Sequence, residues 1–150
     1  MPASLPTESE FDPYLCDLDA QHAWKNFGGL TVDQACAKFD EAPESYQEDF
    51  MFMGGKAFAF YYPVIDSFLR KSTELSKDDL DDRQSWILPQ CIKSQFQGPR
   101  NEHVRHLKDS VLELCGFMIE NVKLFADDWR DVTEIEREWQ ELKQQVTQSS

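Results

Sequence analysis

EDFMFMGGKAFAFYYPVID, the stretch from Glu48 to Asp66, decides the fold class, because two apolar runs meet in it at Gly54-Gly55. A Gly-Gly pair between apolar runs is a recognised β-hairpin turn. The flanking runs do not alternate apolar with polar residues, so a hairpin would need cover on both faces. Pro63 is expected to kink or split a helix here, since it lacks a backbone N–H. Apolar residues that recur three or four positions apart nevertheless predict a helix here. Its expected buried stripe is Ala57, Phe58, Tyr61, Val64, Ile65, Phe68 and Leu69.

Helix start signals appear on both sides of this stretch. Thr31 and Gln34 have the spacing of a capping box, in which each side chain accepts a hydrogen bond from the other residue's backbone. Thr133 and Glu136 repeat that spacing near the C-terminus. Both pairs precede apolar residues at helical spacing, so we expect a helix to begin at each of them.

The longest periodic segment runs from Val104 to Phe125, where apolar residues recur every three or four positions over about six turns. Gly116 inside it would let another helix approach closely. The sequence therefore predicts an all-α, single-domain bundle of roughly five to seven helices, with a long central amphipathic helix near residues 102–125. The expected division of the chain is a flexible arm at 1–12, a helical domain at 13–146 and a frayed tail at 147–150.

The charge of the chain is strongly acidic and uneven. Its 150 residues include 28 acidic and 15 basic side chains, a formal net charge of −13. Up to Asp49 there are 11 acidic residues against Lys25 and Lys38, which gives −9, and the other 17 acidic and 13 basic residues give −4. Such a field repels nucleic acid and anionic membrane and favours a basic protein partner. Plain solubility is the other explanation, and the sequence leaves both open.

The cysteines indicate reduced thiols. Cys16, Cys36, Cys91 and Cys115 are far apart and form no CxxC pair, which favours buried thiols in a cytoplasmic protein. The first residues lack the basic and apolar regions of an export signal. No apolar run reaches the roughly 18 residues of a membrane span. We therefore expect a cytoplasmic protein that does not bind membranes.

No motif for catalysis, metal or cofactor binding stands out. His103 and His106 share a helix face, as two metal ligands would, but His22 is the only other histidine and the ligand set is incomplete. The runs DDLDD and DDWRD lack the spacing of a calcium loop. Neither a nucleophile elbow nor a glycine-rich phosphate loop occurs. The sequence thus predicts no catalytic residue, no metal and no cofactor, and it leans against an enzyme without excluding one.

The aromatic box, residues 58–62, could serve a second purpose besides packing. Phe60 and Tyr62 lie off the apolar stripe, so we expect them to be partly exposed. With Trp24 and Trp129 they are the candidates for an apolar contact surface or for the lining of a small-ligand pocket.

The segment DFMFMGGKAFAFYYPVIDSFL resembles a motif of small uncharacterised bacterial all-helical proteins, in which an F-x-YY-x-P box follows an acidic stretch with a tryptophan. In this chain the box reads Phe60-Tyr61-Tyr62-Pro63, without the residue between tyrosine and proline. The resemblance covers about twenty residues and carries over no site residue. Some of those proteins resemble immunity partners of toxins, so the resemblance implies a bacterial helical protein with that kind of role.

The predicted function is that of an acidic, non-enzymatic binding protein, such as an immunity-type inhibitor that occludes a basic toxin or another basic protein. Carboxylates on a rigid helical surface would pair with lysine and arginine side chains of the target. The alternative is a small-ligand-binding protein or an enzyme that uses the aromatic box. The identity of the partner and the oligomeric state stay open. The predicted partner-binding residues are Asp33, Asp40, Glu41, Glu44, Glu48, Asp49, Asp78, Asp79, Asp81 and Asp82.

Overall fold

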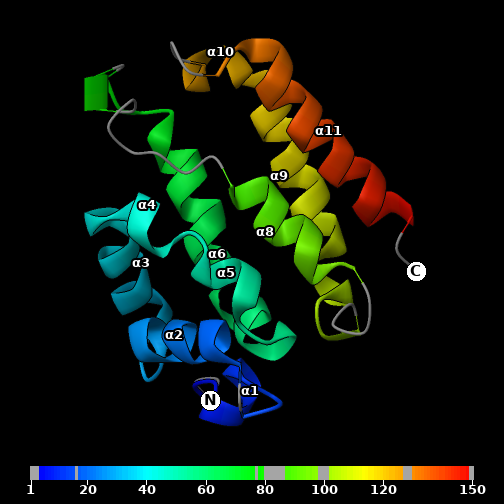
Figure 1. The fold of residues 1–150 in the computed structure, drawn as a ribbon. Coiled ribbons are helices and arrows are strands. Elements are labelled where there is room, and N and C mark those ends of the chain that lie inside the picture. The colour runs from blue at the N-terminus through cyan, green and yellow to red at the C-terminus, as the bar shows by residue number, and fades with distance from the viewer. Residues whose placement is uncertain are drawn as a thin grey trace.

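The computed structural model describes residues 4–15, 17–76, 78–79, 87–97, 102–126 and 130–148. Every regular element in these ranges is helical, which confirms the predicted all-α single-domain bundle (Figure 1). The helices are α1 (Glu8–Phe11), α2 (Leu18–Phe27), α3 (Val32–Glu41), α4 (Pro43–Tyr46), α5 (Asp49–Phe52), α6 (Gly55–Ser72), α8 (Leu88–Gln95), the 3₁₀ helix η2 (Arg105–Leu107), α9 (Lys108–Glu120), α10 (Val122–Phe125) and α11 (Val132–Gln148).

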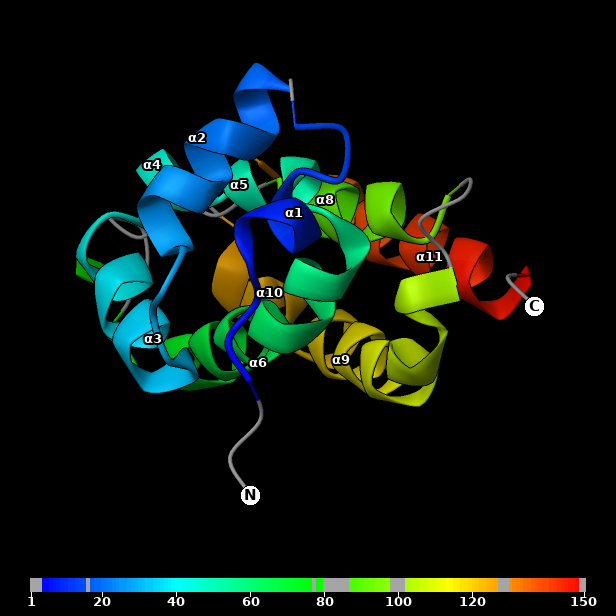
Figure 2. The ribbon, with the colours of Figure 1, turned by 90° about the horizontal axis from the view of Figure 1, so that it is seen from below.

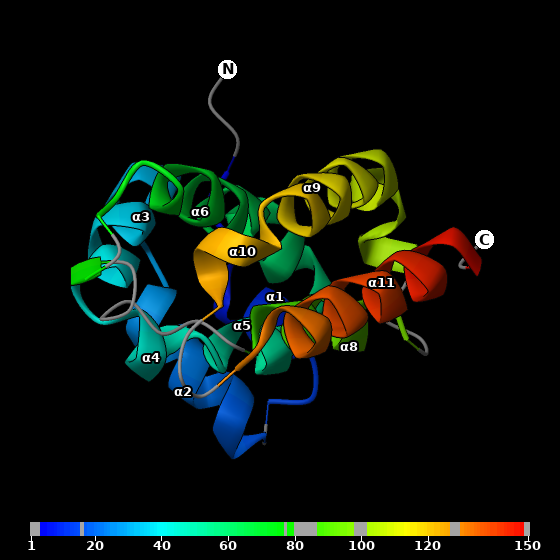
Figure 3. The same ribbon diagram turned by 90° about the horizontal axis from the view of Figure 1, so that it is seen from above.

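Helix α6 lies in the middle of the bundle, between the N-terminal helices and the C-terminal pair. Helices α1 and α3 pack against it, α2 packs against α5, and α5 packs against α8. Helix α11 packs along α9 and α8, and Figure 3 shows α3 and α9 on opposite sides of α6. One hydrophobic core therefore joins residues from Phe11 to Val146.

The Gly54-Gly55 pair is a joint between two helices, so the hairpin alternative is wrong. Helix α5 ends at Phe52, Met53 and Gly54 are extended, and α6 begins at Gly55. The Gly54 N–H donates a hydrogen bond of 2.7 Å to the carbonyl oxygen of Phe11. A methyl group added to Gly54 would overlap the carbonyl oxygen of Glu10. Glycine is required here because α1 lies directly on the joint.

The α6 stripe predicted from the sequence is confirmed, but the expected split at Pro63 is wrong. All seven residues of the stripe are buried, and the helix continues through Pro63 to Ser72. Pro63 lies on the exposed side of α6. The carbonyl that loses its donor to proline can therefore be solvated by water, and the helix persists.

The segment near 102–125 is helical but is not one long helix. It consists of η2, α9 and α10, and Asn121 interrupts it with φ −113° and ψ 17°. The side-chain amide of Asn121 donates to the carbonyl oxygen of Phe117 at 2.8 Å, which satisfies a backbone acceptor where the ladder stops. No heavy atom lies within 4 Å of a methyl group added to Gly116, so this glycine does not mark a close helix approach.

The two predicted capping boxes have different outcomes. Thr31 and Gln34 form the box that opens α3, with hydrogen bonds of 2.9 and 3.2 Å. Helix α11 instead begins at Val132, where the Asp131 carboxylate accepts from the Glu134 N–H at 2.8 Å. Thr133 is therefore inside the first turn and is not the cap. The motif alone did not distinguish between two neighbouring oxygen-bearing side chains.

Residues Glu8–Phe11, inside the segment 1–12 that was predicted to be a flexible arm, form the short helix α1. Thr7 and Glu10 form a capping box for α1, and Phe11 is completely buried against Trp24 and Tyr61. A four-residue helix has little stability of its own. Burial of the Phe11 ring is what holds α1 in place.

Candidate protein-interaction surface

Five of the predicted acidic residues form what we call the acidic α3–α4 surface. Helix α3 ends at Glu41, and α4 starts two residues later at Pro43, whose ring suits the first turn of a helix. The α3 face that packs on α6 carries Ala35 and Phe39, which leaves the acidic side chains to solvent. The exposed members of the surface are Asp33, Asp40, Glu41, Glu44 and Glu48.

The acidic α3–α4 surface has a net negative formal charge. Between residues 31 and 48 five carboxylates face one lysine, which leaves −4. That lysine, Lys38, is held close to the fold: its Nζ donates to the Asn26 carbonyl oxygen at 2.6 Å and lies 5.3 Å from the Tyr46 ring centre. Within the described ranges, no ion pair joins Glu41 or Glu44 to a lysine or arginine.

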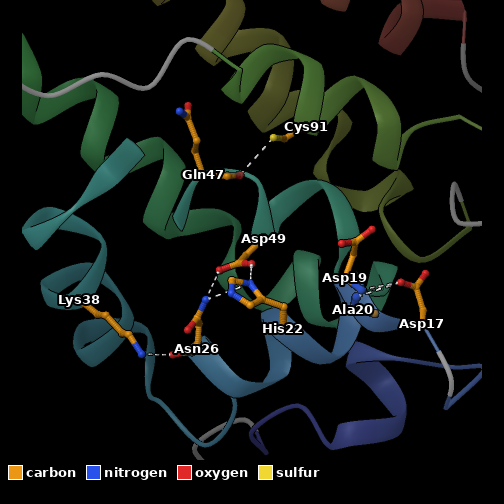
Figure 4. Close-up of polar contacts among 9 residues, drawn as sticks. All are labelled: Asp17, Asp19, Ala20, His22, Asn26, Lys38, Gln47, Asp49 and Cys91. Atoms are coloured by element: carbon orange, nitrogen blue, oxygen red, sulfur yellow. Dashed lines mark hydrogen bonds and ion pairs between the residues drawn. The ribbon is translucent and has the colours of Figure 1, made fainter. Parts of the chain in front are cut away.

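Asp49 does not belong to this surface, although it was predicted there. Its side chain is only 4% exposed, and it accepts hydrogen bonds from the Asn26 amide at 2.8 Å and from His22 Nδ1 at 3.0 Å (Figure 4). His22 and Asn26 lie one turn apart on α2, so the Asp49 carboxylate fastens α5 to α2. The neighbouring Glu48 is exposed, since successive helical residues point about 100° apart.

The turn that carries Glu48 is fixed onto α8. The Gln47 carbonyl oxygen accepts from Cys91 Sγ at 3.2 Å, and the Gln47 side-chain oxygen accepts from the Ile87 N–H at 3.2 Å. The buried amide of Gln95 donates to the carbonyl oxygens of Phe50 and Met53 at 2.9 and 2.8 Å. Burial, together with the carboxylates of Glu48 and Asp49, raises the pKa of Cys91 to about 12. The acidic α3–α4 surface thus ends on a rigid support.

The second predicted acidic cluster is described only in part. Asp78 and Asp79 are exposed, and Ser76 Oγ accepts from the Asp79 N–H at 3.3 Å, as a helix cap would. Asp81 and Asp82 lie outside the described residues.

The aromatic box is mostly core. Phe58, Tyr61 and Tyr62 are buried, so the expected exposure of Tyr62 is wrong. The Tyr61 hydroxyl lies 2.9 and 2.7 Å from the carbonyl oxygens of Phe27 and Leu30, to which it donates. Burial raises the pKa of Tyr61 to about 12 and that of Tyr62 further still. Tyr61 therefore holds the N-terminal helices on α6, and the Tyr62 hydroxyl donates to the Ser110 carbonyl oxygen of α9 at 3.5 Å.

The other candidates for an apolar contact surface are Phe60, Trp24 and Trp129. Phe60 is partly exposed, as predicted, and its ring packs at a right angle on Tyr61 with centres 4.9 Å apart. Trp24 is also partly exposed and contacts Phe11 edge-on at 5.3 Å. Trp129 lies outside the described residues. Phe60 and Trp24 thus pack on two different buried rings, Tyr61 and Phe11.

The described residues assemble neither a metal site nor a disulfide bond. No group of three histidine, cysteine, aspartate or glutamate side chains could hold a metal ion there. His103 is paired with Glu102 at 3.3 Å. The described cysteines, Cys36, Cys91 and Cys115, are all free thiols. Among the described helices, none has the length and apolar content that a membrane crossing requires.

Sequence reasoning missed the residues that support the surface. His22, Asn26, Gln47 and Gln95 act through tertiary contacts with partners 23 to 45 positions away. One signal was available: His22 and Asn26 lie at i and i+4, which places two polar side chains on one helix face.

Comparison of the chain with protein-family models, with curated proteins and with solved structures finds no match. The resemblance of the aromatic box to immunity-like bacterial proteins stays a prediction.

Proposed function

We propose that this protein binds a basic protein and blocks it by electrostatic and steric occlusion, as an immunity-type inhibitor of a toxin does. The acidic α3–α4 surface carries the proposal: residues 31–48 contain five exposed carboxylates and one lysine, and that lysine is itself engaged with Asn26 and Tyr46. A cytoplasmic, bacterial setting belongs to the same proposal.

The electrostatic part of the mechanism acts before and during contact. A net negative field attracts a basic partner and speeds encounter, and its pattern of charges selects the orientation. Lysine and arginine side chains of the partner would then pair with Glu41, Glu44 and Glu48. Each such pair at an exposed rim is weak alone, so several must act together.

The rigid support explains why this surface suits binding. Glu48 follows Gln47, which is bonded to α8 through both its backbone and its side chain. Because the backbone is already ordered before the partner arrives, little conformational entropy is lost on association. A bulky partner held against α3 and α4 would have its own surface covered by the bundle.

Affinity capture from a lysate of the native host tests the proposal. The bait is the full chain, loaded at low salt and eluted with a salt gradient, and the eluted proteins are identified by mass spectrometry. A triple variant with Glu41→Gln, Glu44→Gln and Glu48→Gln removes three charges without changing shape. A matched control removes three exposed glutamates from α9 and α11, namely Glu113, Glu120 and Glu141, by the same Glu→Gln change.

The expected result is one basic protein that the wild type and the control retain and the α3–α4 variant loses, with release at moderate salt. Identical retention by both variants, or a complex that salt does not weaken, would contradict the proposal.

A further inference from the structure

The connection between α1 and α2, together with the first residue of α2, exposes three large apolar side chains within five residues. Tyr14 is 77% exposed, Leu15 64% and Leu18 86%, and we call these three residues the apolar loop patch. The other exposed large hydrophobic residues in the described ranges, Leu5 and Leu124, are only 38% and 43% exposed. Figures 1 and 2 place this connection at the edge of the molecule, where no other helix covers it. Apolar groups gathered on a surface in this way mark sites of protein contact.

Hydrogen bonds hold the residues before and after the apolar loop patch in place. The buried Asp12 carboxylate accepts from the Gln21 side-chain amide at 2.8 Å and from the Asp17 N–H at 3.3 Å. The Asp12 carbonyl oxygen accepts from the Leu15 N–H at 3.0 Å. Asp17 in turn caps α2, with its carboxylate accepting from the Asp19 N–H at 2.9 Å. The apolar loop patch is thus presented by a loop fixed at both ends.

Two features of this loop oppose folding. Leu15 has φ 58°, in the left-handed region that glycine and asparagine favour and leucine avoids. Asp12 Oδ1 is buried and has no hydrogen-bond partner among the described residues. A strained backbone that lifts a leucine into water does not serve stability, and such strain is concentrated at functional sites.

The charge around the patch selects its partner. Residues 4–30 contain five acidic side chains and one lysine, which leaves −4. Asp17 and Asp19 are exposed on either side of Leu18. This negative charge disfavours binding to a second copy of the same chain or to an anionic membrane. It favours binding to a segment that carries lysine or arginine beside apolar residues.

We propose that the apolar loop patch docks a basic amphipathic helix of the partner protein, with Tyr14, Leu15 and Leu18 covering the apolar face of that helix. The inference rests on the proposed function, because the helix belongs to the same basic partner. It adds an apolar contact that rim charges alone lack, and Tyr14 is of a residue type enriched among the side chains that contribute most to affinity in protein interfaces.

Two synthetic peptides of equal length and charge probe the patch: one carries lysine on one helix face and leucine on the other, and its match has glutamine in place of leucine. Binding to the full chain is measured by fluorescence anisotropy at physiological salt. The test variants are Leu18→Gln and Leu15→Gly, and Leu124→Gln serves as the control at an exposed leucine elsewhere. Leu15→Gly relieves the backbone strain, so its Tm should equal or exceed that of the wild type while its binding falls.

We expect the wild type to bind the Lys/Leu peptide more tightly than the Lys/Gln peptide. Each patch variant should lose about tenfold in affinity for the Lys/Leu peptide alone, the factor expected when one leucine no longer leaves water. Unchanged Lys/Leu binding in both patch variants would overturn the inference, and so would a wild-type dimer in sedimentation that Leu18→Gln dissociates.

The same measurement separates this inference from the proposed function. If both peptides bind equally and salt weakens them, the charge-based function stands and the patch inference fails. If the Lys/Leu peptide binds through the patch but neither salt nor the Glu41, Glu44 and Glu48 changes affect it, the patch inference stands and the charge-based function fails. If neither peptide binds, the patch inference fails, and the capture experiment alone decides the charge-based function.

Discussion

Gly54 lies where α1 rests on the joint between α5 and α6, and its replacement by alanine has a calculable effect. The added methyl group would overlap the Glu10 carbonyl oxygen and would lie 3.2 Å from Pro13 Cδ. Because the obstacle is backbone, α1 has to move away from the joint. The hydrogen bond of 2.7 Å from the Gly54 N–H to the Phe11 carbonyl oxygen is then lost, and the Phe11 ring is withdrawn from the core.

The magnitude follows from these two losses. Exposing the Phe11 ring costs about 2–3 kcal/mol, and the hydrogen bond contributes about 1 kcal/mol. Gly54→Ala should therefore lower the free energy of unfolding by about 3–4 kcal/mol, or the Tm by roughly 10 °C for a domain of this length. Urea unfolding followed by circular dichroism, with calorimetry for the Tm, measures both quantities.

Gly116 supplies the matched control for this prediction. Gly116 lies inside α9, and no heavy atom is within 4 Å of the added methyl group. Gly116→Ala should raise the free energy of unfolding by about 0.5–1 kcal/mol, because alanine loses less backbone entropy. The reasoning is refuted if Gly54→Ala stays within about 0.5 kcal/mol of the wild type, or if the two substitutions destabilise the protein equally.

Three further outcomes follow from the buried polar groups. Asp49→Ala should lower the free energy of unfolding by about 2–3 kcal/mol in urea unfolding, because it removes the buried acceptor of two side-chain hydrogen bonds, and it should leave the captured partner bound. Glu48→Gln should leave the free energy of unfolding unchanged and weaken partner binding only modestly, because it removes one rim charge. Equal effects of the two substitutions on stability would contradict the burial of Asp49. Burial raises the pKa of Cys91, Cys115 and Tyr61 to about 12, from ordinary values of 9 and 10. The unfolded chain releases these protons at a lower pH than the folded chain does. Their contribution to the free energy of unfolding is therefore complete below pH 9 and is lost as pH rises toward 12. A urea midpoint that stays constant between pH 9 and 12 would contradict the burial of these groups. Iodoacetamide at about pH 8 should leave Cys91 and Cys115 unmodified in the native protein and modify both in urea, and peptide mapping that finds either one labelled in the native state would contradict their burial.

The elements that could be predicted from the sequence are those set by local spacing. The stripe from Ala57 to Leu69 needs only a period of three to four residues, and the Thr31–Gln34 box needs only two side chains three positions apart. Both arise from contacts within one helix, so neighbouring residues contain the information. Pro63 was misjudged because its effect depends on which side of α6 faces water, and the sequence does not state that side directly.

The features that could not be predicted depend on contacts between distant segments. Asp49 is buried because α2 brings His22 and Asn26 to it from 27 and 23 residues away. A short helix such as α1 persists because Phe11 finds a place in the core, which overrides its low intrinsic stability. The exposed acidic residues of α3 and α4 were predictable, since charged side chains opposite an apolar stripe face solvent by default.

Salt dependence of the affinity tests the role of the acidic α3–α4 surface most directly. The measurement is the Kd between this protein and the purified basic protein that it captures, by titration calorimetry from about 0.05 to 0.5 M NaCl, a range over which the Debye length falls severalfold. The wild type should bind less tightly as salt rises, and the variant with Glu41→Gln, Glu44→Gln and Glu48→Gln should bind weakly at low salt with a much smaller salt dependence. A wild-type Kd that is constant across this range, or an equal salt dependence in the variant, would contradict charge-based binding at this surface.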